Sequence, residues 1–146
     1  MPKVITTGQV NNVNAFLFLK KLNLILLCGF YLLAGINHFW HPDAYLDLIP
    51  PYLPNHYLLN IISGVVEISS GILMIIPFTR RIAAYLLIAL LIAFIPAHIY
   101  LIQQKGCISK YLCVAEWIAW IRLIPFQLIL MWWVWKTYKW NKNILR

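Results

Sequence analysis

The clearest clue to the fold lies between Leu58 and Pro77, where the chain reads LLNIISGVVEISSGILMIIP. This segment holds a single charged residue, Glu67, among side chains that are otherwise apolar, small or uncharged. A helix needs about 20 largely apolar residues to cross a bilayer, and this segment is long enough. Because lipid offers the backbone no hydrogen-bond partners, so long a continuous segment is predicted to be a helix rather than a barrel strand.

The rest of the chain repeats this pattern. Further apolar segments lie at Leu22–Trp40, Ile82–Ile102 and Val114–Trp135. Hydrophobic residues make up 62% of the 146 residues and charged residues 11%, whereas soluble domains have about 45–50% and about 25%. Mean hydropathy is +0.76, and a globule of this size cannot bury so much apolar surface. We therefore predict an all-α membrane protein, a four-transmembrane-helix bundle, and exclude soluble enzymes, secreted disulfide scaffolds and disordered chains.

The positive charges predict the orientation of the bundle. The net charge is +8, yet the Lys and Arg residues form no contiguous patch that would indicate nucleic acid as a partner. Nine of them flank the same side of the predicted spans, and the alternate loops hold only Lys105 and Lys110. Since positive residues remain in the cytoplasm, both termini are predicted to be cytoplasmic. Residues 1–21 would be a polar cytoplasmic N-terminus, 22–135 the transmembrane domain and 136–146 a basic cytoplasmic tail.

Two charged residues, Glu67 and Arg122, lie deep inside predicted spans. Glu67 shares one helical face with Asn60, Gly64 and Gly71, and such small residues let a second helix approach closely. Arg122 lies at a similar depth in the fourth span, where an unpaired arginine costs about 2.5–3.5 kcal/mol. An ion pair between Glu67 and Arg122 would relieve both charges. Such a pair could be purely structural or part of a binding site, and the sequence leaves both readings open.

Two histidines point to the same depth. His38 ends the first span, and His98 follows Pro96 late in the third, so four ionisable groups from four helices are predicted to converge in the outer half of the membrane. Gln127 is a further candidate of the polar interior. On an ideal helix it lies about 140° around from Arg122, which predicts a different contact.

These groups suggest a ligand. Arginine can hold a carbonyl or anionic oxygen, and histidine and carboxylate can relay protons. With predicted aromatic walls from Phe39, Trp40, Trp117 and Trp120, the pocket would suit a quinone headgroup or a similar amphiphile. Two histidines could instead ligate haem, but neither helix carries a paired-histidine pattern. A zinc site has no supporting spacing. We expect no metal, no haem, and a quinone as the candidate cofactor.

The loops on the outer side carry two further predictions. The proline-rich segment 41–54 mixes apolar and aromatic residues and is expected to lie against the mouth of the bundle. Cys107 and Cys113 are six positions apart and could close a short disulfide in an oxidising compartment, and the sequence leaves open whether they are bonded. Cys28 lies within a span and is predicted to pack in the interior.

A set of short motifs, in order along the chain, extends from about Leu22 to Trp135. It consists of Leu33–Phe39 with Pro42, Tyr45, Ile49-Pro50 and Leu53-Pro54, then Ile62–Ile68 with Pro77–Arg80, then Pro96–Ile99 and Arg122–Gln127. This set resembles the DoxX family of small bacterial membrane proteins. The resemblance implies a four-helix fold in the bacterial inner membrane and a link to quinone-dependent oxidoreductases, with His38, Glu67, His98, Arg122 and Gln127 as the polar interior.

The sequence thus leads to a functional hypothesis. We expect an inner-membrane protein that binds a quinone or similar amphiphile in an outer-half polar pocket. It would serve as an accessory redox subunit of a quinone-linked oxidoreductase, without independent enzymatic activity. Its partners would be the lipid bilayer, a redox protein or a second copy of the chain. The alternatives are a non-catalytic scaffold or assembly factor with a structural Glu67–Arg122 pair, and an oligomeric small transporter.

Overall fold

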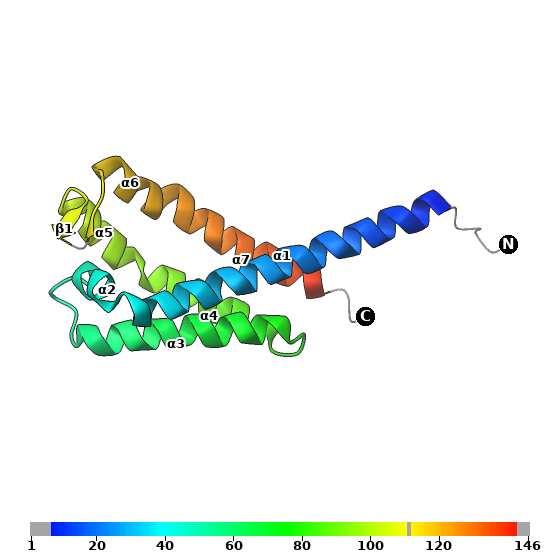
Figure 1. Cartoon of the computed structure of the whole chain (residues 1–146), viewed down its shortest axis with the longest axis horizontal. Coiled ribbons are helices and arrows are strands. Elements are labelled where there is room, and N and C mark those ends of the chain that lie inside the picture. The colour runs from blue at the N-terminus through cyan, green and yellow to red at the C-terminus, as the bar shows by residue number, and fades with distance from the viewer. Residues whose placement is uncertain (1–6, 111, 143–146) are drawn as a thin grey trace.

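The structure, a computed structural model, describes the backbone of residues 7–110 and 112–142 and the side chains of residues 12–141 apart from Tyr111. Helices dominate it, and a short hairpin lies at one end (Figure 1). The elements in chain order are α1 (Thr7–Trp40), α2 (Pro42–Leu48), α3 (His56–Ile75), α4 (Arg80–Ala93), α5 (Ile95–Gln103), β1 (Cys107–Ser109), β2 (Leu112–Cys113), α6 (Glu116–Ile121), the π-helical turn η1 (Arg122–Phe126) and α7 (Gln127–Lys142).

Four helical segments of the described chain are long and apolar enough to cross a membrane, as predicted. They are Asn12–Trp40, His56–Ile75, Arg80–Gln103 and Glu116–Asn141. α1 packs on α3, α3 on α4, α4 on α7, and α7 on α1, so the helices form a closed ring. This arrangement indicates a multi-pass membrane protein.

Some predicted boundaries differ from the observed ones. The first helix begins at Thr7 rather than after a polar segment ending at residue 21, and α7 continues into the predicted tail as far as Lys142. Both extensions have the same cause, since a helix already nucleated in the apolar segment propagates readily into flanking residues of moderate propensity. Residues 1–6 and 143–146 of the predicted N-terminus and tail lie outside the described residues.

Local chemistry defines the ends of α3. The Asn55 side chain accepts a hydrogen bond from the backbone N–H of Leu58 at 3.3 Å and so caps the start of the helix. At the other end, Ile76 is extended, as the residue before Pro77 prefers to be. The guanidinium of Arg80 then donates to the freed carbonyls of Met74 and Ile75, at 2.8 and 3.0 Å.

The small residues on α3 bring α1 close, as the sequence predicted. A methyl group at Gly35 would lie 2.8 Å from the carbonyl oxygen of Gly64, and one at Gly64 would lie 2.9 Å from Cβ of His38. No side chain fits between the two backbones at this crossing. The contact therefore holds His38 against the polar face of α3.

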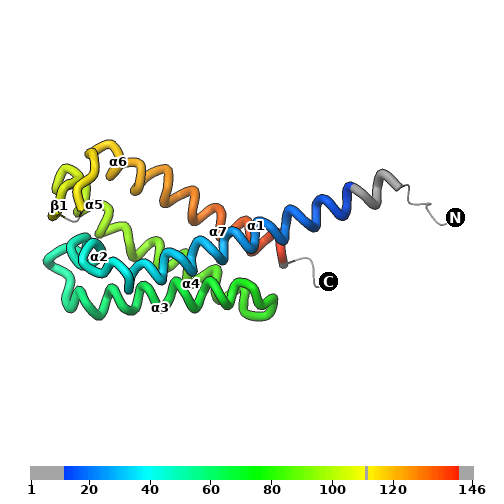
Figure 2. Tube along the Cα trace, in the orientation of Figure 1, coloured from blue at the N-terminus to red at the C-terminus, as the bar shows by residue number. Residues whose placement is uncertain are grey.

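The two ends of the bundle differ in what they enclose. Near the termini the helices form an apolar core that includes Leu27, Leu87 and Val134, together with Cys28 as predicted. Toward the other end α6 and α1 diverge, and α2, α5 and the hairpin fill that end (Figures 1 and 2). The polar residues of interest lie at this wider end.

The connecting segments at the wider end are ordered. Part of the proline-rich segment forms α2, which packs against α1, α3 and α5 as expected for a loop held at the bundle mouth. β1 and β2 pair antiparallel, with Cys107 opposite Cys113, and a disulfide joins these two residues. Both strands contact α2, so the hairpin braces this cap.

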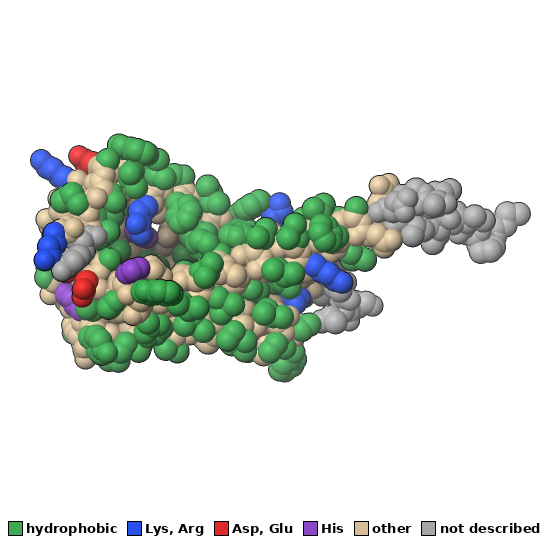
Figure 3. Space-filling model, in the orientation of Figure 1, with side chains coloured by type: hydrophobic (Ala, Val, Ile, Leu, Met, Phe, Trp, Pro, Cys, Tyr) green, Lys and Arg blue, Asp and Glu red, His purple; other side chains and the backbone are tan. Residues whose placement is uncertain are grey.

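The outward surface is largely apolar. Large hydrophobic side chains are exposed along all four long helices, and Figure 3 shows them covering most of the visible face. On this face the Lys, Arg, Asp and Glu side chains lie toward the two ends of the four-helix bundle. At the wider end, one basic side chain lies beside a hollow. Such a belt matches a protein surrounded by lipid.

Candidate ligand-binding cavity

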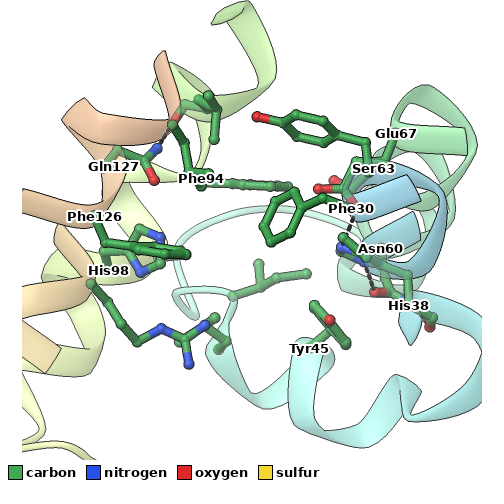
Figure 4. Close-up of a pocket in the computed structure, with 18 residues that line it drawn as sticks. Phe30, His38, Tyr45, Asn60, Ser63, Glu67, Phe94, His98, Phe126 and Gln127 are labelled. Atoms are coloured by element: carbon green, nitrogen blue, oxygen red, sulfur yellow. Dashed lines mark hydrogen bonds and ion pairs between the residues drawn. The ribbon is translucent and has the colours of Figure 1, made fainter. Parts of the chain in front are cut away.

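A cavity of about 240 Å³ lies inside the wider end of the bundle. Its walls come from α1, α2 and α3 on one side and from the α4–α5 junction, η1 and α7 on the other, as the close-up in Figure 4 shows. The lining residues are Phe30, Tyr31, Ala34, His38, Tyr45, Leu48, Ile49, Asn60, Ser63, Glu67, Leu91, Phe94, Ala97, His98, Arg122, Phe126, Gln127 and Leu130.

The first wall carries a hydrogen-bonded group of three side chains. Asn60 Nδ2 donates to the backbone carbonyl of His38 at 3.0 Å, and this orients Asn60 Oδ1 toward His38 Nδ1, 2.7 Å away. Since an amide oxygen only accepts, His38 Nδ1 must carry the hydrogen of this bond. His38 Nε2 lies 3.5 Å from Oε2 of Glu67, and both side chains are buried.

Tyr45 ties the α2 cap to this wall. Its ring stacks on the imidazole of His38 with centroids 3.8 Å apart and an interplanar angle of 28°. Its hydroxyl accepts a hydrogen bond from Asn37 Nδ2 at 2.8 Å. Two contacts to consecutive residues of α1 thus hold the cap over the cavity.

The opposite wall is built from two helix interruptions. α4 ends at Ala93 and α5 begins at Ile95, where Pro96 in the first turn cannot donate a backbone hydrogen bond. The fourth helix contains the π-helical turn η1 around Pro125. π-turns occur frequently at functional sites, and here the two interruptions present Phe94, His98 and Phe126 to the cavity.

The π-helical turn corrects the predicted direction of Gln127, whereas the separate contact predicted for this residue is observed. An α-helix would place Gln127 well away from the side of Arg122, but both residues line the cavity. A π-turn bonds residue i to i+5 and so brings residues five apart toward one side. The Gln127 side chain donates to the backbone carbonyl of Leu91, which anchors α7 to α4 just below the helix interruption.

The predicted ion pair between Glu67 and Arg122 is not formed. Among the described residues, the ion-pair partner of Glu67 is His38. Helix order explains this, because α3 neighbours α1 and α4 in the ring and η1 belongs to the opposite wall. Equal depth in the membrane was therefore not sufficient to bring the two charges together.

Several buried polar atoms around the cavity lack a hydrogen-bond partner. Within the described part of the chain these include Tyr31 Oη, Glu67 Oε2 and His98 Nδ1, on side chains of residues at most 8% exposed. An unsatisfied buried polar group costs about 1–3 kcal/mol. Three such groups around one cavity indicate a place where a ligand or water completes the hydrogen bonding.

The structure brings together all five predicted polar residues, since His38, Glu67, His98, Arg122 and Gln127 line the same cavity. The four predicted aromatic wall residues do not contribute. Their exposed fractions are 47% for Phe39, 75% for Trp40, 64% for Trp117 and 46% for Trp120, so they face outward.

Helical geometry explains the error in the aromatic wall. Phe39 and Trp40 follow His38 directly and so lie about 100° and 200° around α1 from it. Tyr31 and Ala34 precede His38 by seven and four positions and share its face, which makes them wall residues. The spacing from His38 could have identified Tyr31 as a wall residue from the sequence. Phe94 and Phe126 could not be identified in this way, because the direction of their side chains depends on the helix interruptions.

No group of three or more His, Cys, Asp or Glu side chains that could hold a metal ion is found among the described residues. The cavity instead combines aromatic rings with single polar groups on facing walls. The fold and the cavity together define a helical, multi-pass membrane protein with an internal cavity near one end.

Comparison with known proteins gives the family. The sequence pattern of a family described as a domain of unknown function, DUF8561, matches residues 27–138, and the chain belongs to this family. The resemblance to the DoxX family is thereby corrected, since the match is to DUF8561 and not to DoxX. No curated protein and no solved structure matches the chain.

Proposed function

We propose that this protein binds the ring-shaped headgroup of a quinone or similar amphiphile within the membrane. The observation that carries the proposal is the set of buried polar atoms of Tyr31, Glu67 and His98 that lack a hydrogen-bond partner around one cavity. A ligand with oxygen atoms on a ring would reach groups on both walls at once. The aromatic side chains between them would contact its faces.

The size of the cavity supports one ring rather than a whole amphiphile. A volume of about 240 Å³ exceeds the roughly 150 Å³ of a cavity that accommodates benzene, and it is somewhat smaller than typical sites for drug-sized ligands. A substituted ring would fill it. A long apolar tail would have to extend outside the cavity, among lipid chains.

The shape of the bundle supports entry from the membrane. α1 and α6 diverge at the wider end, and in the space-filling view a hollow flanked by a basic side chain and a histidine lies between α2 and α6 (Figures 1 and 3). A ligand with an apolar tail could enter the cavity there without crossing water. We place the cavity in the outer half of a bacterial inner membrane, because the charge distribution predicts cytoplasmic termini.

In this role the protein would act as an accessory redox subunit. The cavity residues would hold the ligand while a separate catalytic protein exchanged electrons with it. The chain itself would contribute binding groups and proton carriers to the reaction.

The test is extraction of bound ligand. Protein purified in mild detergent is extracted with solvent, and quinones are quantified by mass spectrometry in the wild type, Glu67→Gln and Glu116→Gln. The control, Glu116→Gln, makes the same chemical change at an exposed position of α6. We expect near-stoichiometric quinone in the wild type and control, and its loss from a still-folded Glu67→Gln protein. Bulk lipid alone in all three would refute the proposal.

The scaffold alternative makes a different prediction. It relied on a structural Glu67–Arg122 pair, and the observed partner of Glu67 is His38. If the polar interior serves stability alone, Glu67→Gln would reduce the yield of folded protein. The molecules extracted from the wild type and from the variant would then be the same.

A further inference from the structure

The net charge of the cavity follows from the titratable side chains that line it. The titratable side chains lining it are Tyr31, His38, Tyr45, Glu67, His98 and Arg122. The two tyrosines are counted as uncharged phenols. The charge of the cavity therefore depends on the two histidines, the carboxyl group and the guanidinium.

His38 and Glu67 together contribute no net charge. The hydrogen on His38 Nδ1 is committed to Asn60, so a neutral imidazole would present the lone pair of Nε2 to Glu67. Nε2 and Oε2 are 3.5 Å apart in a buried site, where two lone pairs would repel each other. One proton must lie on one of the two groups, and either placement gives the pair a total charge of zero.

Arg122 is left without a counterion. Its side chain is half-buried at the cavity wall, and among the described residues it has neither an ion pair nor a hydrogen bond. Guanidinium remains protonated in proteins, so this group adds a full positive charge. His98 also lies near Arg122, and a proton on its imidazole would only increase the positive total. The side chains that line the cavity thus carry a net charge of at least +1.

We infer that the natural ligand carries a single negative charge on its ring, as an aromatic carboxylate or an ionised ring hydroxyl, and that Arg122 binds this group. This inference rests on the proposed function and narrows the headgroup to an anionic ring, so among quinones it selects those that carry an ionised ring hydroxyl. A neutral ring would leave the charge of Arg122 uncompensated at the membrane, which is unfavourable. A monoanion would neutralise it through charge-assisted hydrogen bonds.

The two walls then bind different parts of the ligand. Arg122 holds the anionic group on the side of η1 and α5. The rings of Phe94 and Phe126 contact the faces of the aromatic ring, and the His38–Glu67 pair lies on the facing wall (Figure 4). Tyr31, whose hydroxyl has no hydrogen-bond partner, also lines the cavity. A second oxygen on the ligand ring could bond to the Tyr31 hydroxyl.

The inference can be tested with three probes that share one alkyl tail. 4-Decylbenzoate carries a ring and an anion, 4-decylbenzamide a ring without charge, and decyl phosphate an anion without a ring. Binding to the full chain in neutral detergent is measured by calorimetry for the wild type, Arg122→Gln and Arg81→Gln. Arg81 is the matched control, since it is exposed at the opposite end of the bundle.

We expect the benzoate to bind about tenfold or more tightly than the benzamide, and the phosphate more weakly than the benzoate. In Arg122→Gln the affinity for the benzoate should fall to that for the benzamide. The affinity for the benzamide should not change, which would show that the cavity is intact. Arg81→Gln should behave as the wild type.

Equal binding of benzoate and benzamide, or an unchanged preference in Arg122→Gln, would overturn the inference and leave the proposed function standing. A phosphate that binds as tightly as the benzoate would overturn the requirement for a ring. Absence of binding by all three would overturn both.

Discussion

Among single residues, Gly64 allows the close approach of α1 to α3 that brings the polar groups of the first wall together. A methyl group there would lie 2.7 Å from the ring of Phe39 and 2.9 Å from Cβ of His38, so α1 would have to move away from α3. We expect Gly64→Ala to lower the free energy of unfolding by about 1–3 kcal/mol, as overpacking does. Thermal unfolding in detergent measures the change.

Gly29 provides the matched control for this prediction. It lies in the same helix as His38, and a methyl group there would have no neighbour within 4 Å. Gly29→Ala should be neutral or stabilising by up to about 1 kcal/mol, because alanine favours the helix. Equal melting temperatures for the two variants would show that the close approach of α1 to α3 is not needed for stability.

Among the elements, the hairpin and α2 act as one cap over the cavity. Both strands contact α2, and the disulfide between Cys107 and Cys113 closes the hairpin. A cross-link over so short a loop is worth about 2 kcal/mol in the chain-entropy picture. Both cysteines are exposed and open to a reductant, so we expect reduction to lower the melting temperature by several degrees and to speed the release of a bound probe.

The double variant Cys107→Ser/Cys113→Ser separates this effect from other actions of the reductant. It should unfold at the temperature of the reduced wild type and show no further response to reductant. Wild-type protein that keeps its melting temperature after complete reduction would show that the hairpin does not depend on its disulfide.

For the whole molecule, the charge distribution predicts which end faces the cytoplasm. The turn with Phe78 and the loop with Gln104 lie at opposite ends of the bundle, and both residues are exposed. We expect a membrane-impermeant maleimide added to intact cells to label Gln104→Cys but not Phe78→Cys. Broken cells, in which both variants should react, provide the control. Labelling of Phe78→Cys alone would mean that the orientation is inverted and that the cavity faces the inner leaflet.

Much of the architecture could be predicted residue by residue along the chain. Hydropathy located the four spans to within a few residues at most ends, and the spacing of Asn60, Gly64 and Glu67 identified the face of α3 that packs on α1. The facing cysteines and the ordered proline-rich cap were also expected. These features depend on how each segment partitions between water and lipid and on short helical repeats, which are properties of local sequence.

The partners of the polar residues could not be predicted in this way. Depth in the membrane suggested that Glu67 would meet Arg122, but the order of helices around the ring placed His38 beside it. The π-helical turn rotated Gln127 onto the cavity, and the outward direction of Phe39 and Trp117 left other aromatic rings to form the wall. Hydropathy and residue spacing thus establish what enters the membrane and how deeply. Which side chains meet there depends on helix order, rotation and local unwinding, because these are set by the packing of all four helices at once.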